Sequence, residues 1–207
     1  MLDKEVILIG YSGHAFVVAE TALENGLEII GYSDKKQSDL DPYNLSYLGF
    51  ENDDAFIGFE KEVSFVLGIG DNKLRQKIAN LVENKGKSVE TIIHKTANIS
   101  KNAKIGNGSF INKNVLVNAL AVVGKCVILN TGCIIEHECV LADAVHIGPG
   151  EVLAGNVSVG ERTFVGANAV IKQGIVIGKD VVIGAGTVVI TNIADGKKVV
   201  GNPGKII

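Results

Sequence analysis

The sequence predicts two folds in one chain of 207 residues, an α/β domain with a small parallel sheet and then an all-β parallel β-helix. An aliphatic residue recurs at every sixth position from Ile93 to Val189, whereas an α-helix or a pleated strand selects a period of 3.6 or 2. A fixed six-residue repeat is typical of a parallel β-helix with three short strands per turn. The N-terminal part shows instead apolar runs that alternate with helical segments, which favours a parallel sheet. We therefore expect a Rossmann-like domain over residues 1–88 and the β-helix over residues 89–207.

The elements of the N-terminal domain follow from its apolar runs and its glycines. The first strand, Val6 to Ile9, is a short apolar run of the kind that parallel sheets bury. Gly26 directly follows the first helical stretch and Gly86 lies two residues after the second, and both glycines are expected to end these helices. In chain order, the sequence predicts a strand over 6–9, a loop over 10–14, a helix over 15–25, a strand over 28–32, a strand over 63–69 and a helix over 73–84.

The loops after these strands are the expected ligand site, because ligands of parallel sheets lie beyond the carboxyl ends of the strands. The first loop, Gly-Tyr-Ser-Gly-His over residues 10–14, is similar to a shortened phosphate-binding turn at a helix N-terminus. It is not GxGxxG, and simple turn chemistry is an equal alternative. Asp34 fits a carboxylate that bonds a ribose or uracil edge, or a solvated strand end. Gly70 and Asn72 could close the site or cap the following helix.

Positions within the repeat predict the interior of the β-helix. The residue after the aliphatic one is often glycine, which we attribute to the backbone angles of a sharp corner. Four residues after the aliphatic one, small or β-branched residues are expected to fill a narrow interior, and Cys133 and Cys139 lie there as packing residues. Glu151 breaks this pattern, so the turn around it is expected to differ from the others. The repeat leaves no room for an ejected loop, so a binding groove must use coil surfaces and a neighbouring subunit.

Composition excludes several classes of function. The net charge of −3 and the pI of about 5.8 argue against a nucleic-acid face. The sequence holds no apolar run near the length of a membrane span and no cleavable signal pattern, so a cytoplasmic protein is expected. We expect no metal site, because the separated histidines and glutamates lack the spacing of a ligand set.

His137 is the candidate general base of the repeat, because it lies between Glu136 and Glu138. A carboxylate bonded to one ring nitrogen fixes the tautomer and raises the basicity of the other nitrogen. The alternative is an ordinary polar surface residue, and spacing alone leaves both open. Neighbouring side chains of a regular strand point to opposite faces, so this pair requires a corner or a distorted backbone.

The whole chain resembles the sugar O/N-acetyltransferase family of hexapeptide-repeat proteins, which includes sialic acid O-acetyltransferases and bacillosamine-type nucleotide-amino-sugar N-acetyltransferases. One departure is Gly204, where the closing motif of the family usually has alanine. The family implies a left-handed β-helix. The segments that carry the resemblance are VILIGYSGHAFVVAE, GIGDNKLRQKIA, IIHKTANIS, ILNTGCIIEHECVLADAVHIGPG, AGNVSVGERTFVGANAVI and VGNPGKI.

The resemblance implies a role for individual residues. His137 matches the general base of the family, Glu138 the residue that raises its basicity, and His146 the histidine that contacts acetyl-CoA. The implied contacts of backbone groups with the pantetheine arm fall on Gly155, Ala167 and Ala185. The implied nucleotide-sugar pocket comprises Gly10, Ser12, Gly13, His14, Asp34, Lys35 and Gly70, with Lys35 where some members carry a second aspartate.

The activity implied by the resemblance is direct acetyl transfer from acetyl-CoA to the amine of a nucleotide-linked sugar of the 4-amino-4,6-dideoxy type, for surface glycans such as lipopolysaccharide. A homotrimer with active sites shared between subunits is also implied. The first alternative is an O-acetyltransferase acting on sialic acid or a related sugar. The second is a non-catalytic solenoid that binds a nucleotide sugar.

Overall fold

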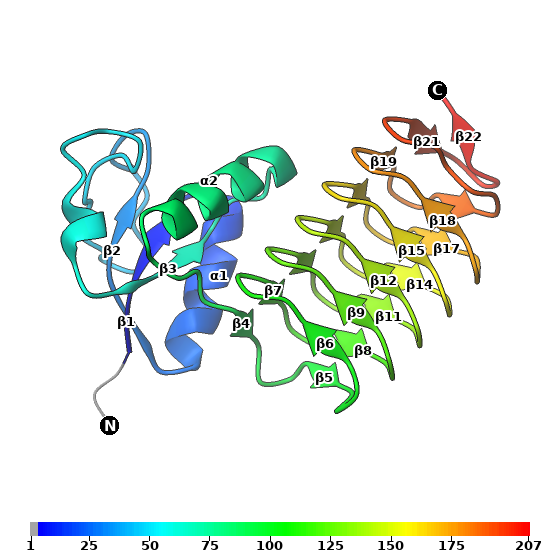
Figure 1. The fold of residues 1–207 in the computed structure, drawn as a ribbon, viewed down its shortest axis with the longest axis horizontal. Coiled ribbons are helices and arrows are strands. Elements are labelled where there is room, and N and C mark those ends of the chain that lie inside the picture. Colours follow the sequence, from blue (N-terminus) through cyan, green and yellow to red (C-terminus); the bar gives the residue numbers. More distant parts are fainter. Residues whose placement is uncertain (1–3) are drawn as a thin grey trace. The chain divides into compact units, whose positions relative to one another are not determined.

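The computed structural model describes residues 4–207, which divide between Ile92 and Ile93 into two compact units (Figure 1). The first unit is an α/β unit and the second is a solenoid of short parallel strands. This is the predicted order of an α/β fold followed by a parallel β-helix. No helix among residues 4–207 has the length and apolar character needed to cross a membrane.

The N-terminal unit is a three-stranded parallel sheet in the order β2-β1-β3. Its strands are β1 (Lys4–Ile9), β2 (Leu27–Ser33) and β3 (Ser64–Leu67), and its helices are α1 (Gly13–Glu24) and α2 (Asn72–Asn84). The side chains of residues 6–9 in β1 and of all four residues in β3 are buried, and so are those of Ile29 and Tyr32 in β2, as the apolar runs predict. Gly26 and Gly86 have φ values of +77° and +72°, the left-handed conformation that commonly ends a helix. One short element was not predicted, the 3₁₀ helix η1 (Ile57–Glu60).

The second unit carries strands two residues long, each ending on an aliphatic position of the repeat. The strands are β4 (Ile92–Ile93), β5 (Asn98–Ile99), β6 (Lys104–Ile105), β7 (Phe110–Ile111), β8 (Leu116–Val117), β9 (Val122–Val123), β10 (Ile128–Leu129), β11 (Ile134–Ile135), β12 (Val140–Leu141), β13 (His146–Ile147), β14 (Val152–Leu153), β15 (Ser158–Val159), β16 (Phe164–Val165), β17 (Val170–Ile171), β18 (Val176–Ile177), β19 (Val182–Ile183) and β20 (Val188–Val189). β21 (Lys198–Val200) and β22 (Lys205–Ile206) close the unit as an antiparallel pair.

These strands stack into three sheets, visible as columns in Figure 1. The first sheet runs from β4 through β13 to β22, the second from β5 through β11 to β20, and the third from β6 through β12 to β18. From β5 to β20, strands pair in parallel with strands 18 residues away, so equivalent positions of successive coils lie directly above one another. Each corner of the coil therefore joins two sheets and lies opposite the third.

The interior of the solenoid is an aliphatic column that includes Cys133 and Cys139, both fully buried. Burial raises the pKa of both thiols, so they stay protonated at neutral pH. The expectation of a different turn at Glu151 was wrong. Gly150 has a φ of +64°, close to the +67° of Gly132 in the coil before, and β14 keeps the common register. The glutamate leaves the backbone of the turn unchanged, because its carboxyl is enclosed in the interior like the smaller side chains at equivalent positions.

The corner glycines serve a purpose other than the predicted one. Gly106, Gly124, Gly148, Gly160, Gly166, Gly178 and Gly184 all lack a positive φ. The left-handed residue of each corner comes two positions later, for example Cys126 or Arg162. A Cβ built on Gly160 would lie 2.5 Å from the carbonyl carbon of Gly178 and from the backbone nitrogen of Lys179. These glycines are therefore required by the close stacking of the next coil.

Gly160→Ala is expected to lower the free energy of unfolding by about 1–3 kcal/mol, because the new methyl group meets backbone atoms that cannot rotate away. Denaturant unfolding measures the loss. The exposed corner residue Gln173 provides the control, and Gln173→Ala should unfold like the parent protein. Equal stability of Gly160→Ala and the parent would refute the steric explanation.

Candidate active site

His137 and Glu138 lie at the corner between β11 of the second sheet and β12 of the third sheet. Glu138 is the left-handed residue of this corner, with a φ of +61°. Its Oε2 lies 3.1 Å from Nδ1 of His137, and the two side chains are 51% and 57% exposed. The left-handed turn therefore removes the geometric difficulty of pairing two neighbouring side chains, and it does so in contact with solvent.

The pairing also distinguishes between the two flanking glutamates. The Glu136 carboxylate accepts a hydrogen bond of 3.4 Å from the backbone N–H of His137, whereas Glu138 contacts the ring. A carboxylate can only accept, so the ring donates from Nδ1. This fixes the tautomer in which Nε2 has the lone pair, and Nε2 is the nitrogen that can take a proton.

Gly155 shares the corner of His137, one coil further along. His146 lies instead on β13 of the first sheet, where its ring meets Phe164 edge-on at 5.0 Å between centroids. Ala167 and Ala185 belong to the corner between the first and second sheets in successive coils. Within one chain, the predicted coenzyme residues therefore lie in two places. Gly155 lies at the corner of His137, whereas His146 lies on the first sheet, and Ala167 and Ala185 lie at the corner where the first sheet meets the second.

The predicted nucleotide pocket lies at the carboxyl ends of the N-terminal strands. Gly10 has a φ of +86°, and Asp34 accepts hydrogen bonds from the backbone N–H groups of Tyr11 (2.9 Å) and Lys35 (2.7 Å). A hollow of about 310 Å³ is lined by Tyr11, Ser12, Asp34 and residues 36–40. A smaller one of about 70 Å³ adjoins Gly10, Asp34 and Lys35. The first loop and Asp34 therefore line the same hollow, and the Asp34 carboxylate holds the loop by accepting a hydrogen bond from the backbone N–H of Tyr11.

His14 and Gly70 lie on the neighbouring part of this edge, since a Cβ on Gly70 would be 3.9 Å from that of His14. Burial, with the nearby positive charge of Arg75, lowers the pKa of His14 to about 4. His14 is therefore neutral at pH 7. Gly13 begins α1 with open space where a side chain would extend.

The residue that caps α2 is neither of the two that the sequence suggested. Asp71 is the N-cap and accepts a hydrogen bond of 2.8 Å from the backbone N–H of Leu74. Asn72 is buried, and its side-chain oxygen accepts a hydrogen bond of 2.9 Å from Arg75. Asn72 therefore supports the loop from inside the protein.

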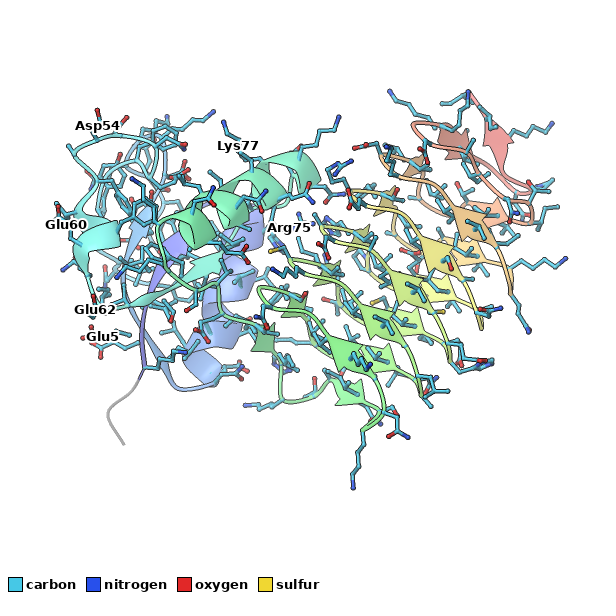
Figure 2. All side chains as sticks on the ribbon, viewed as in Figure 1. Glu5, Asp54, Glu60, Glu62, Arg75 and Lys77 are labelled. Carbon is cyan, nitrogen blue, oxygen red and sulfur yellow. The ribbon has the colours of Figure 1, made fainter. Side chains whose placement is uncertain are left out.

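Sequence reasoning missed Arg75, which lies on α2 and is labelled in Figure 2. Its side chain is 1% exposed and donates to the carbonyl oxygens of Ile69 (3.2 Å) and Gly70 (3.0 Å). The signal was present in the helical period, because positions 75, 78, 79 and 82 form the buried stripe of α2. An arginine on such a stripe needs internal acceptors, and here these are the carbonyls that shape the predicted pocket.

The described residues 4–207 contain no group of three or more histidine, cysteine, aspartate or glutamate side chains that could hold a metal ion. The chemistry available at the solenoid corner is thus that of an oriented imidazole in contact with solvent. It can accept a proton from a nucleophile and return it to a leaving group.

Family models match both units of the chain. Residues 5–82 match the PglD N-terminal domain, residues 138–173 the bacterial transferase hexapeptide (six repeats), and residues 156–191 the hexapeptide repeat of succinyl-transferase. Among curated proteins, no sequence matches this chain significantly.

Solved structures match the chain over its whole length. The acetyltransferase domain of PglB from Neisseria gonorrhoeae FA1090, in complex with acetyl coenzyme A, is 31% identical, with 99% of this chain and 100% of that chain covered and a TM-score of 0.92. PerB from Caulobacter crescentus, in complex with CoA and GDP-perosamine, is 34% identical, with 100% and 98% covered and a TM-score of 0.91. WeeI from Acinetobacter baumannii AYE has the same fold at 23% identity, with 99% and 100% covered and a TM-score of 0.87.

The resemblance inferred from the sequence is therefore confirmed on both units. The chain belongs to the family of hexapeptide-repeat acetyltransferases in which a PglD-type N-terminal domain precedes the solenoid.

Proposed function

We propose that this protein transfers the acetyl group of acetyl-CoA to the amine of a nucleotide-linked sugar of the 4-amino-4,6-dideoxy type. The observation that carries the proposal is the His137–Glu138 pair on an exposed corner of a solenoid whose full-length relatives hold acetyl coenzyme A, or CoA with GDP-perosamine. The pair supplies a base of fixed tautomer, and the relatives indicate which reactants meet it.

In the proposed reaction, the sugar amine attacks the thioester carbonyl while Nε2 of His137 takes the proton that nitrogen loses. The C–N bond forms, the C–S bond breaks, and the imidazolium returns its proton to the departing CoA thiolate. The carboxylate of Glu138, 3.1 Å from Nδ1, stabilises the imidazolium. Proton transfer of this kind contributes about 10²–10⁴-fold to a rate, and proximity of the reactants supplies much of the remainder.

The site is proposed to lie between two subunits of a homotrimer. His137 and Gly155 occupy the corner between the second and third sheets, whereas His146 lies on the first sheet, across the same coil. A coenzyme that meets both histidines therefore needs a second chain to bring its first sheet against the first chain's corner. Backbone groups of Gly155, Ala167 and Ala185 are proposed to contact the pantetheine arm.

The nucleotide is proposed to bind the N-terminal unit at Gly10, Ser12, Gly13, Asp34 and Lys35, with His14 and Gly70 at the edge of the site. Support comes from the hollow beside Ser12 and Asp34 and from the match of this unit to the PglD N-terminal domain. The product suits surface glycan synthesis. The cytoplasm, where acetyl-CoA is made, is the proposed location.

The proposal is tested by incubating the protein with acetyl-CoA and a panel of UDP-, GDP- and dTDP-linked amino sugars, with sialic acid as an additional acceptor. CoA release is followed with a thiol reagent, and the product is identified by mass spectrometry. We expect acetylation of one nucleotide amino sugar to give an amide that survives mild alkali. An alkali-labile ester would indicate O-acetylation, and tight binding of a nucleotide sugar without CoA release would indicate the binding solenoid.

A further inference from the structure

The corner that carries His137 is built from equivalent residues of successive coils, 18 positions apart. Ala119, His137, Gly155 and Gln173 occupy this position in turn. Hydrogen bonds link the coils here, including one of 2.9 Å from the N–H of Asn156 to the carbonyl of His137. Ala119 and Gln173 are exposed, as expected of a solenoid corner, but Gly155 is buried. Something other than the coil itself therefore covers Gly155.

The cover is the imidazole ring of His137. A Cβ built on Gly155 would lie 2.5 Å from Cε1, 2.5 Å from Nε2 and 3.2 Å from Nδ1 of that ring. A carbon atom does not approach a heavy atom to which it is not bonded as closely as 2.5 Å, so the ring occupies the space that any side chain at position 155 would need. The edge of the ring that touches this space is the edge that carries Nε2.

The backbone gives no other reason for glycine at this position. The left-handed residue of this corner is Asn156, with a φ of +57°, and Gly155 itself lacks a positive φ. A glycine that adopts an ordinary backbone conformation destabilises the fold relative to alanine by leaving the unfolded chain more freedom. The contact with His137 is the feature that accounts for this glycine.

We propose that Gly155 is a positioning residue, which holds the Cε1–Nε2 edge of the His137 ring against the backbone of the next coil so that Nε2 is presented to the acceptor amine. The inference rests on the proposed function of His137 as the base. Two contacts then fix the ring, the Glu138 carboxylate at Nδ1 and the bare backbone of Gly155 beneath the other edge. With a methyl group at position 155, the ring must rotate, and Nε2 leaves its place or Nδ1 leaves Glu138.

Gly155→Ala is therefore expected to lower kcat by about 10²-fold, the loss that follows a displacement of about 1 Å at a reacting group. KM for the acceptor should change far less, and so should KM for acetyl-CoA. A role confined to pantetheine contact would instead raise KM for acetyl-CoA at nearly constant kcat. Gln173→Ala, at the same corner one coil further, is the matched control and should keep the parent values.

A double-mutant cycle with His137→Ala distinguishes a specific contact between Gly155 and the His137 ring from a general effect of Gly155→Ala on folding. In the presence of His137, Gly155→Ala should lower Tm. In the His137→Ala background the space is vacant, so the same change should leave Tm unchanged or raised, and kcat should fall no further. An equal loss of Tm in both backgrounds would overturn the inference, as would parent kcat in Gly155→Ala.

The two ideas fail in different ways. If His137→Ala keeps the parent kcat, the proposed base is wrong, while the Tm cycle still reports whether the ring and Gly155 compete for space. If His137→Ala is inactive and Gly155→Ala is fully active, the assignment of His137 as the base is supported, and the positioning role of Gly155 is wrong.

Discussion

Replacement of His137 by alanine is expected to lower kcat by about 10²–10⁴-fold, because the change removes the group that accepts the amine proton. The side chain is half-exposed and lies outside the aliphatic column, so the fold should survive its loss. KM values for acetyl-CoA and for the acceptor should change little, since the base acts mainly in the transition state. CoA release under saturating substrates measures the effect.

Substitutions of the two glutamates that flank His137 provide matched comparisons for this experiment. Glu138→Gln keeps the size of the side chain but removes the charge that stabilises the imidazolium, so kcat should fall less than in His137→Ala. Glu136→Gln should have little effect, because the Glu136 carboxylate bonds the backbone of His137 and not its ring. CoA release by His137→Ala at the parent rate would contradict the assignment of the base.

The second large effect is expected from Glu151, whose carboxyl is fully buried in the solenoid interior. Oε2 accepts a hydrogen bond of 3.1 Å from the N–H of Gly148, and Oε1 has no partner among the described residues. Burial raises the pKa of this carboxyl well above its ordinary value of 4.5. Below pH 4.5 the group is protonated in both states. Above it, the unfolded chain releases the proton at a lower pH than the folded protein does, so rising pH favours unfolding.

Glu151→Ala and Glu151→Gln should remove this dependence. The free energy of unfolding of each variant, relative to the parent, is expected to rise between pH 5 and pH 7, by up to about 1.4 kcal/mol per pH unit. Denaturant unfolding at several pH values measures it. Both variants should show the same slope of this stability difference against pH, although the cavity left by alanine lowers the stability of Glu151→Ala by an amount that does not depend on pH. Stability curves that run parallel to the parent curve across this range would contradict the buried acid.

Most of the fold could be predicted because the signals are periodic or local. The six-residue spacing identified the strands of the solenoid from Ile93 onward, since one slip would expose an aliphatic residue of the column. Gly26 and Gly86 predicted the ends of both helices to within two residues. The corner glycines were correctly seen as special but for the wrong reason. Stacking against the next coil depends on residues 18 positions away, which the local pattern does not reveal.

The candidate site was predictable in its residue types but less so in its geometry. Whether His137 meets Glu136 or Glu138 depends on the left-handed φ of Glu138, and an isolated glutamate rarely adopts that conformation. The contact of Gly155 with the ring likewise appears only when successive coils are stacked. Arg75 was missed because the buried face of a helix is recognised by its apolar residues, and arginine is almost never fully buried unless it is paired.

The most direct test of this account is a crystal structure of the protein with CoA and the nucleotide amino sugar that it acetylates. We predict that Nε2 of His137, with its ring over Gly155, lies 2.6–3.2 Å from the sugar amine and beside the sulfur of the coenzyme, as a general base requires. An amine held far from this corner, with His137 facing only solvent, would contradict it.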